Sequence, residues 1–139
     1  MKNKKKLLYK DKKANIEQCS VSQCLMINID GFLGSDQMTS LFEKAYQLFT
    51  ESTQSKPALI LNAIKLGAVK KAEQAWLNDH WNKRMFQAGL KHLAIINPDN
   101  IFGEVAIRTY LENNQNTLHY MLNTKTFKDE KAAQRWVLG

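Results

Sequence analysis

The sequence lacks most of the motifs that identify an enzyme. Its 139 residues contain no G-x-S-x-G nucleophile motif, no G-x-G-x-x-G or G-K-S/T phosphate loop and no H-x-x-x-H or H-E-x-x-H pair. The three histidines, His80, His92 and His119, are scattered over a helix-like segment and two strand-like segments. We therefore expect no catalytic residues, no metal and no cofactor, and we expect that the chain is not an enzyme. An enzyme of unrecognised type stays a third possibility, because an active site can be assembled from residues far apart in the sequence.

Long apolar runs are also missing. The longest runs span only a few residues, whereas a membrane-spanning helix needs about 20. The basic residues at the start are followed by only three apolar residues, which is too few for a signal peptide. We expect no transmembrane segment and a cytoplasmic location.

Cysteine is scarce, and the chain has two, Cys19 and Cys24. They are four residues apart in a segment that reads as strand, turn and strand. A lone pair with this spacing lacks the second pair of ligands that a zinc site needs, and the cytosol keeps thiols reduced. The prediction is two packed thiols, and a zinc content of one ion per chain would contradict it.

The formal net charge of +7 is concentrated at the N-terminus. Residues 1–13 hold seven lysines and one aspartate, while the remainder carries thirteen basic and twelve acidic residues. We expect residues 1–6 to form a flexible basic tail and residues 7–139 to form a single domain. Such a tail is typical of a solvated terminus, and the alternative is an arm attracted to RNA or to an anionic membrane. The nearly neutral body predicts no specific binding of nucleic acid.

Hydrophobic patterning predicts strands alternating with helices. Apolar runs bounded by polar turns predict strands at residues 7–10, 15–19, 24–29, 58–61, 93–96 and 118–122. Apolar residues spaced three and four apart predict a long helix beginning near residue 35, helices at residues 69–88 and 100–112, and a short helix close to the end of the chain. Together they indicate an α/β fold with a mixed, mostly parallel sheet of about five or six strands and about four helices.

Polar residues and glycine mark the expected helix ends. Ser35 and Asp129 are placed to cap the first and last helices, and Asp99 or Asn100 is placed to cap the helix at residues 100–112. Gly89 follows the helix at residues 69–88, where a glycine commonly ends a helix.

Asparagines follow three of the expected strands. Asn62, Asn97 and Asn123 each come directly after an apolar run. In open parallel sheets, ligands bind outside the carboxyl ends of the strands, so Asn62 and Asn97 are candidate ligand contacts. Asparagine is also a common turn residue, and both interpretations stay open at this stage.

The helix at residues 69–88 has apolar residues on two sides. Leu77, Trp81 and Met85 follow one another at intervals of four, while Val69, Ala72, Trp76 and, beside them, Ala75 and Phe86 lie roughly opposite. Three interpretations remain: packing against the sheet on one side and a loop or helix on the other, a self-association surface, or the wall of an apolar ligand pocket. The candidate contact residues are Trp76, Trp81, Met85 and Phe86.

Several segments resemble the bacterial SpoIIAA-like family, which is related to STAS domains and more distantly to the CRAL-TRIO lipid-binding fold. They are Tyr9 near the first strand, Trp76 and Trp81 in the second long helix, Ala-Gly-Leu-Lys-His-Leu-Ala-Ile-Ile-Asn-Pro at residues 88–98, and Phe-Lys-Asp-Glu-Lys-Ala-Ala-Gln-Arg-Trp-Val-Leu at residues 127–138. The resemblance covers residues 7–138 and implies a small α/β sandwich that often self-associates.

In one respect the chain departs from the proteins that it resembles. Anti-sigma-factor antagonists carry a phosphorylated serine after a central strand, but residues 62–69 contain neither serine nor threonine. We therefore expect a non-enzymatic, STAS-like binding or protein-interaction domain without that switch. Its expected partner is a second copy of the chain, another protein or an apolar small molecule. The alternative function is a carrier or sensor of an apolar, lipid-like small molecule.

Overall fold

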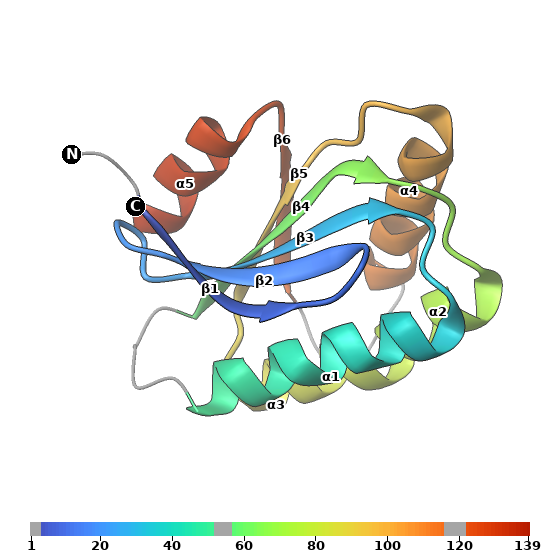
Figure 1. The fold of residues 1–139 in the computed structure, drawn as a ribbon, viewed down its shortest axis with the longest axis horizontal. Helices are drawn as coiled ribbons and strands as arrows, with labels where there is room; N and C mark the ends of the chain where they lie inside the picture. The colour runs from blue at the N-terminus through green and yellow to red at the C-terminus, as the bar shows by residue number, and fades with distance from the viewer. Residues whose placement is uncertain (1–3, 52–56, 116–121) are drawn as a thin grey trace.

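Six strands form one sheet in which each strand lies beside its neighbour in the sequence (Figure 1). The computed structural model describes residues 4–51, 57–115 and 122–139. The strands are β1 (Lys5–Lys10), β2 (Ala14–Cys19), β3 (Leu25–Gly31), β4 (Ala58–Leu66), β5 (His92–Ile96) and β6 (Asn123–Phe127). Strands β1, β2 and β3 pair antiparallel, whereas β3, β4, β5 and β6 pair parallel. This is the mixed, mostly parallel α/β sheet that the sequence predicts.

Helices cover one face of the sheet fully and the other face in part (Figure 1). They are α1 (Ser35–Glu51), α2 (Lys71–Trp76), α3 (Asn82–Gln87), α4 (Ile101–Gln115) and α5 (Glu130–Leu138). A π-helical turn, Leu77–Trp81, joins α2 and α3 into one rod. None of the helices in the described ranges is long and apolar enough to cross a membrane.

The strands bury alternate residues in two different apolar clusters. In β4, Leu59 belongs to the larger cluster, under α1, the α2–α3 rod and α4, whereas Ile60 belongs to the smaller cluster under α5. Burial on both faces is the reason why the central strands read as unbroken apolar runs. Cys19 and Cys24 are both buried in the smaller cluster, as expected for packed thiols.

Three of the expected helix ends are confirmed. The Asp129 carboxylate accepts a hydrogen bond from the Ala132 backbone at 2.9 Å, and the Asn100 side chain accepts one from the Gly103 backbone at 2.9 Å. Gly89 ends the α2–α3 rod with a φ of +112°, a conformation that glycine adopts without strain. The expectation for Ser35 is wrong: it is the first residue of α1, and its hydroxyl donates to Glu73 instead of capping the helix.

Two of the expected strands also need correction. Strand β4 continues to Leu66, so Asn62 lies inside a strand, where its side chain bonds to that of Asn28 on β3. Of the strand expected at residues 118–122, all but the last residue lies outside the described ranges, and the observed last strand begins at Asn123. The observed strand lies at the edge of the sheet and is mostly polar, so a search for apolar runs does not predict it.

The basic N-terminal segment enters the sheet earlier than expected. Strand β1 begins at Lys5, and the Lys5 ammonium pairs with Glu130 at the start of α5. The Lys4 backbone donates to the Ser20 hydroxyl at 2.8 Å. Lys5 and Lys6 therefore belong to the folded domain and not to a tail.

The π-helical turn clarifies the two-sided pattern of residues 69–88. Such a turn inserts an extra residue into the helical ladder and shifts the phase of the side chains that follow it. Gln74, Leu77, Trp81 and Met85 all face the interior, while Trp76 is half-buried against the larger core. The rod has one buried face and an exposed flank, and of the apolar residues on its second side Ala72, Ala75 and Phe86 are exposed.

Candidate functional site

A groove lies between α2 and α4 on the helical side of the molecule. Its volume is about 560 Å³, within the range of roughly 300–1,000 Å³ that small-molecule sites occupy. Each wall is a row of residues three or four apart on one helix, as expected for a single helix face. One row is Lys71, Gln74, Ala75, Asn78 and Asp79; the other is Phe102, Val105, Ala106, Thr109 and Asn113; and Ala68 and Val69 close one end.

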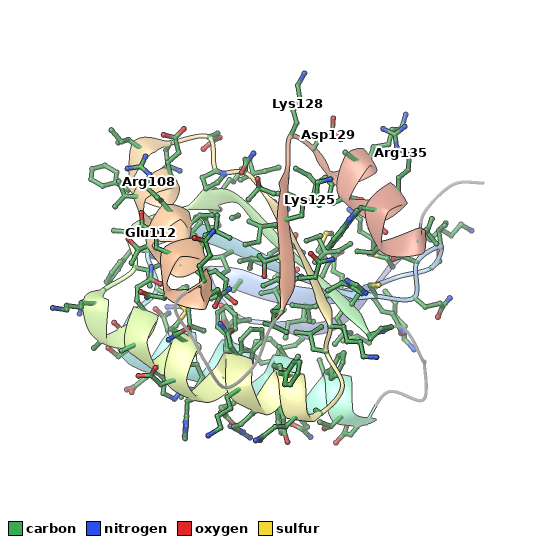
Figure 2. The ribbon with its side chains drawn as sticks, turned by 180° about the vertical axis from the view of Figure 1, so that it is seen from behind. Arg108, Glu112, Lys125, Lys128, Asp129 and Arg135 are labelled. Atoms are coloured by element: carbon green, nitrogen blue, oxygen red, sulfur yellow. The ribbon has the colours of Figure 1, made fainter. Side chains whose placement is uncertain are left out.

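Two sets of hydrogen bonds join the α2–α3 rod to α4. The Gln74 side chain donates to the Ala106 carbonyl at 2.9 Å. Further along, the Tyr110 hydroxyl donates to the Asn82 side chain at 2.7 Å, and Asn82 donates in turn to Asn114 at 2.7 Å. These contacts tie α4 to the α2–α3 rod at two points, and the axis of α4 crosses that of the rod (Figure 2).

The lining of the groove is apolar toward one end and polar toward the other. At the start of the helices, the lining is mainly apolar, from Val69, Phe102 and Val105. Further along, Asp79 and Asn113 are among the polar lining residues. A molecule with an apolar body and a polar group at one end matches this distribution.

The first turn of α4 exposes three large apolar side chains beside the groove. Ile101 and Phe102 are each 66% exposed and Val105 is 49% exposed. We call these three residues the α4 tip. Isolated apolar residues are common on protein surfaces, but a contiguous group next to a groove is typical of a binding surface.

A close backbone contact holds the α4 tip in place. A Cβ atom on Gly103 would lie 2.4 Å from the Leu66 carbonyl oxygen and 2.7 Å from Pro98 Cβ. The Asn100 side chain also donates to the Leu66 carbonyl, at 2.9 Å. The start of α4 therefore rests directly on the end of β4, which requires glycine at position 103.

A small cavity in the core adjoins the groove. It has a volume of about 30 Å³ and shares Val69, Gln74 and Ala106 with the groove lining. Its other lining residues are almost all apolar and include Trp81 and Leu77. These three shared residues form the boundary between the groove and the core cavity, which we call the shared wall.

Gln74 is the polar residue in that shared wall. Its side chain is buried, with an exposed fraction of 5%, and its Oε1 has no hydrogen-bond partner within the described residues. A buried acceptor without a partner costs about 1–3 kcal/mol. Because Oε1 is itself inaccessible from the groove, a ligand donor could reach it only after a rotation of the Gln74 side chain.

The sequence-predicted residues Trp81 and Met85 lie in the core. The Trp81 indole donates to the Phe42 carbonyl at 2.8 Å, and its ring meets the Phe42 ring edge-on with centroids 4.8 Å apart. Met85 is fully buried. Trp81 contributes to the core cavity, whereas Met85 lines neither that cavity nor the groove.

The other four predicted contacts are dispersed. Trp76 is half-buried near His80, with ring centroids 6.4 Å apart, and Phe86 is 37% exposed. Asn62 lies on the opposite face of the sheet, and Asn97 is exposed after β5. The structure does not bring the six candidates into one site.

Sequence reasoning missed Gln74, Phe102 and Val105. A signal for the last two was present, because α4 buries Ala106 and Tyr110 while its apolar residues also extend to a different side of the helix. No comparable signal existed for Gln74, since its burial depends on the packing of α2 against α4.

Comparison with known proteins gives one informative match. No protein-family model matches the chain, and no curated protein matches it. A solved structure of an uncharacterised protein of the DUF3478 family from Shewanella loihica PV-4, with a SpoIIAA-like fold, aligns with a TM-score of 0.60 over 99% of this chain and 98% of that chain. This chain has a SpoIIAA-like fold. At 18% sequence identity the likeness extends to the fold alone.

The SpoIIAA-like fold confirms the architecture that the sequence resemblance implies. In this chain the connection from β4 to α2 consists of Gly67, Ala68, Val69 and Lys70, so it presents no side-chain hydroxyl. The expectation that the chain lacks the phosphorylated serine of anti-sigma-factor antagonists rests on this segment.

Proposed function

We propose that the chain is a binding domain without catalytic chemistry of its own, and that it holds a small, largely apolar molecule in the groove between α2 and α4. The observation that carries this proposal is the groove itself, which has the volume of a small-molecule site and an exposed apolar end. Burial of Phe102 and Val105 by a ligand would remove apolar surface from water, which favours binding.

The polar part of the lining restricts the ligand. Asp79 is a charged acceptor toward the polar end, and Lys71 lies near the apolar end. A neutral amphipathic molecule that donates one hydrogen bond fits these groups better than a wholly apolar one. This corresponds to the carrier or sensor of a lipid-like molecule among the functions considered.

The lining also supports a role without catalysis. It includes no histidine, cysteine or serine. Its one carboxylate, Asp79, and its one ammonium group, Lys71, are eight residues apart on the helical rod, or about 12 Å along the axis. They form no ion pair with each other within the described residues.

A pair of matched variants tests the groove. Ala72 and Ala75 are both exposed alanines of α2, but only Ala75 lines the groove. We expect Ala75→Trp to fill the groove and to weaken binding of the neutral apolar dye Nile red by about tenfold or more, equivalent to about 1.4 kcal/mol. Ala72→Trp should leave dye binding within about twofold. Equal effects of the two variants, or no saturable dye binding by the parent chain, would contradict the proposal.

A second function, self-association, is favoured by the exposure of the α4 tip. Native mass spectrometry of gently purified protein measures the number of subunits and any retained small molecule together. A dimer that Phe102→Ser dissociates supports association through the α4 tip. A monomer that carries a small molecule supports the ligand-binding proposal instead.

A further inference from the structure

One row of aligned residues crosses the face of the sheet that α5 covers in part. The row is polar on β1 to β4 and apolar on β5 and β6. Strand pairing aligns Lys10, Asn15, Asn28, Asn62, Ile96 and Phe127 across the six strands. Ile96 and Phe127 belong to the apolar cluster under α5. The row is polar from β1 to β4, which leaves a hydrophilic surface beside the α5 layer.

The three asparagines form a hydrogen-bonded ladder. Asn28 donates to Asn15 at 2.7 Å and to Glu17 at 2.8 Å, and Asn62 donates to Asn28 at 2.8 Å. Asparagine is disfavoured in strands, and here it occupies aligned positions on three adjacent strands. The pairing of β3 with β4 also shifts register just after Asn28. Departures from local preference of this kind are concentrated at functional sites.

A polar pocket of about 330 Å³ lies over this ladder. Asn15, Asn28 and Asn62 are among its lining residues, and its charged lining residues are Lys10, Lys12, Lys13, Lys65, Asp11 and Asp30. We call it the asparagine pocket. Four lysines against two aspartates make the pocket electropositive.

The acids near the pocket are Asp11, Asp30, which strand pairing places opposite Lys65, and Glu17, which bonds to Asn28. The Asp11 carboxylate accepts hydrogen bonds from the Lys13 and Ala14 backbones, both at 2.9 Å, which closes the β1–β2 turn. Lys10, Lys12 and Lys65 form no ion pair within the described parts of the chain. Lys10, Lys12 and Lys13 therefore lie at the β1–β2 turn beside the pocket, with exposed side chains, and not in a tail.

On the other side of the molecule, the charged residues are spread out and do not surround a pocket. Figure 2 shows Lys125 on the edge strand β6 and Lys128, Asp129 and Arg135 at and beyond its end, spread along β6 and α5. None of these four residues lines any of the three pockets. Lys125 thus provides a comparison for Lys65: both are exposed strand lysines, but only Lys65 lines the asparagine pocket.

We propose that the asparagine pocket binds a small phosphorylated molecule. Lysine ammonium groups bind phosphate as point charges. Both N–H groups of the Asn15 side chain and one of Asn62 remain available to hydrogen-bond the body of the ligand, because each carboxamide has two donors. The lining has no aromatic side chain, whereas sites for single-stranded RNA use aromatic rings for stacking.

The test uses the full chain and measures binding by isothermal titration calorimetry at low ionic strength. The probes are inorganic pyrophosphate, glucose 6-phosphate, glucose and poly(U). We expect saturable binding of pyrophosphate and glucose 6-phosphate at one site, and no binding of glucose. Lys65→Ala should weaken pyrophosphate binding by about tenfold, as for loss of one charged hydrogen bond, while Lys125→Ala changes it by less than about twofold.

A second variant separates a binding role of the ladder from a structural one. Asn15→Val introduces a better strand residue, so it should keep or raise the melting temperature while weakening glucose 6-phosphate binding by several-fold. A lower melting temperature with unchanged binding would make the ladder structural and overturn the proposal. It is also overturned if pyrophosphate does not bind, if Lys65→Ala and Lys125→Ala weaken binding equally, or if poly(U) binds and pyrophosphate does not.

Discussion

Replacement of Gln74 by leucine should stabilise the protein and impair the groove. The substitution removes the hydrogen bond from Gln74 to the Ala106 carbonyl and also removes a buried acceptor that has no partner within the described residues. The Ala106 carbonyl still accepts its helical bond from Tyr110, four residues later in α4. The substitution therefore removes the Gln74 acceptor without leaving the Ala106 carbonyl unpaired.

The magnitude follows from two opposing terms. A lost hydrogen bond costs about 0.5–1.5 kcal/mol, whereas an unpartnered buried acceptor costs about 1–3 kcal/mol. The difference favours leucine by about 1 kcal/mol. With a urea dependence of about 2 kcal/mol per molar for a small domain, the unfolding midpoint should rise by about 0.5 M.

The assay is urea unfolding followed by tryptophan fluorescence, together with Nile red binding to the folded protein. Gln134 provides a matched control, because it is also buried, its side chain donates to Cys19 Sγ at 3.0 Å, and its Oε1 has no partner within the described residues. Gln134→Leu should raise the midpoint similarly but leave dye binding unchanged. A fall of about 0.5 M or more for Gln74→Leu, about 1 kcal/mol, would refute the reasoning that its unpartnered Oε1 destabilises the folded protein.

Substitutions at four further positions test the surrounding structure by urea unfolding. Gly103→Ala places a Cβ against the Leu66 carbonyl and should lower the free energy of unfolding by about 1–3 kcal/mol, and an unchanged value would mean that this contact is loose. Asp129→Ala removes the cap of α5 and should cost about 1 kcal/mol, while Asp129→Asn should restore most of it. Trp81→Ala should cost about 3–5 kcal/mol, as a buried tryptophan does. Trp76→Ala should cost clearly less, and equal costs would contradict the difference in burial.

The parts of the fold that sequence predicts well depend on local chemistry. Asp129 and Asn100 are recognisable as caps because the hydrogen bond they accept comes from a backbone group three residues away. Gly89 is recognisable as a helix end because few other residues adopt its positive φ. The unbroken apolar runs of β4 and β5 predict a sheet that is covered on both faces.

The parts that sequence missed depend on partners distant in the chain. Asn62 reads as a turn residue, but its partner Asn28 is 34 positions away, and their hydrogen bond permits a polar residue inside β4. The burial of Gln74 likewise depends on Ala106, which is 32 positions away. Neither the groove nor the asparagine pocket could therefore be predicted from spacing along the sequence.

Gly103 also determines how wide the groove can be. The start of α4 rests on β4 through Gly103, while the later part is tied to the α2–α3 rod through Tyr110, Asn82 and Asn114. A larger side chain at position 103 would push out one end of α4 while the other end stays attached, so the helix would pivot about its later turns. The width of the apolar end of the groove, which Phe102 and Val105 line, would change, so a residue that does not line the groove would affect the size of the molecule that fits.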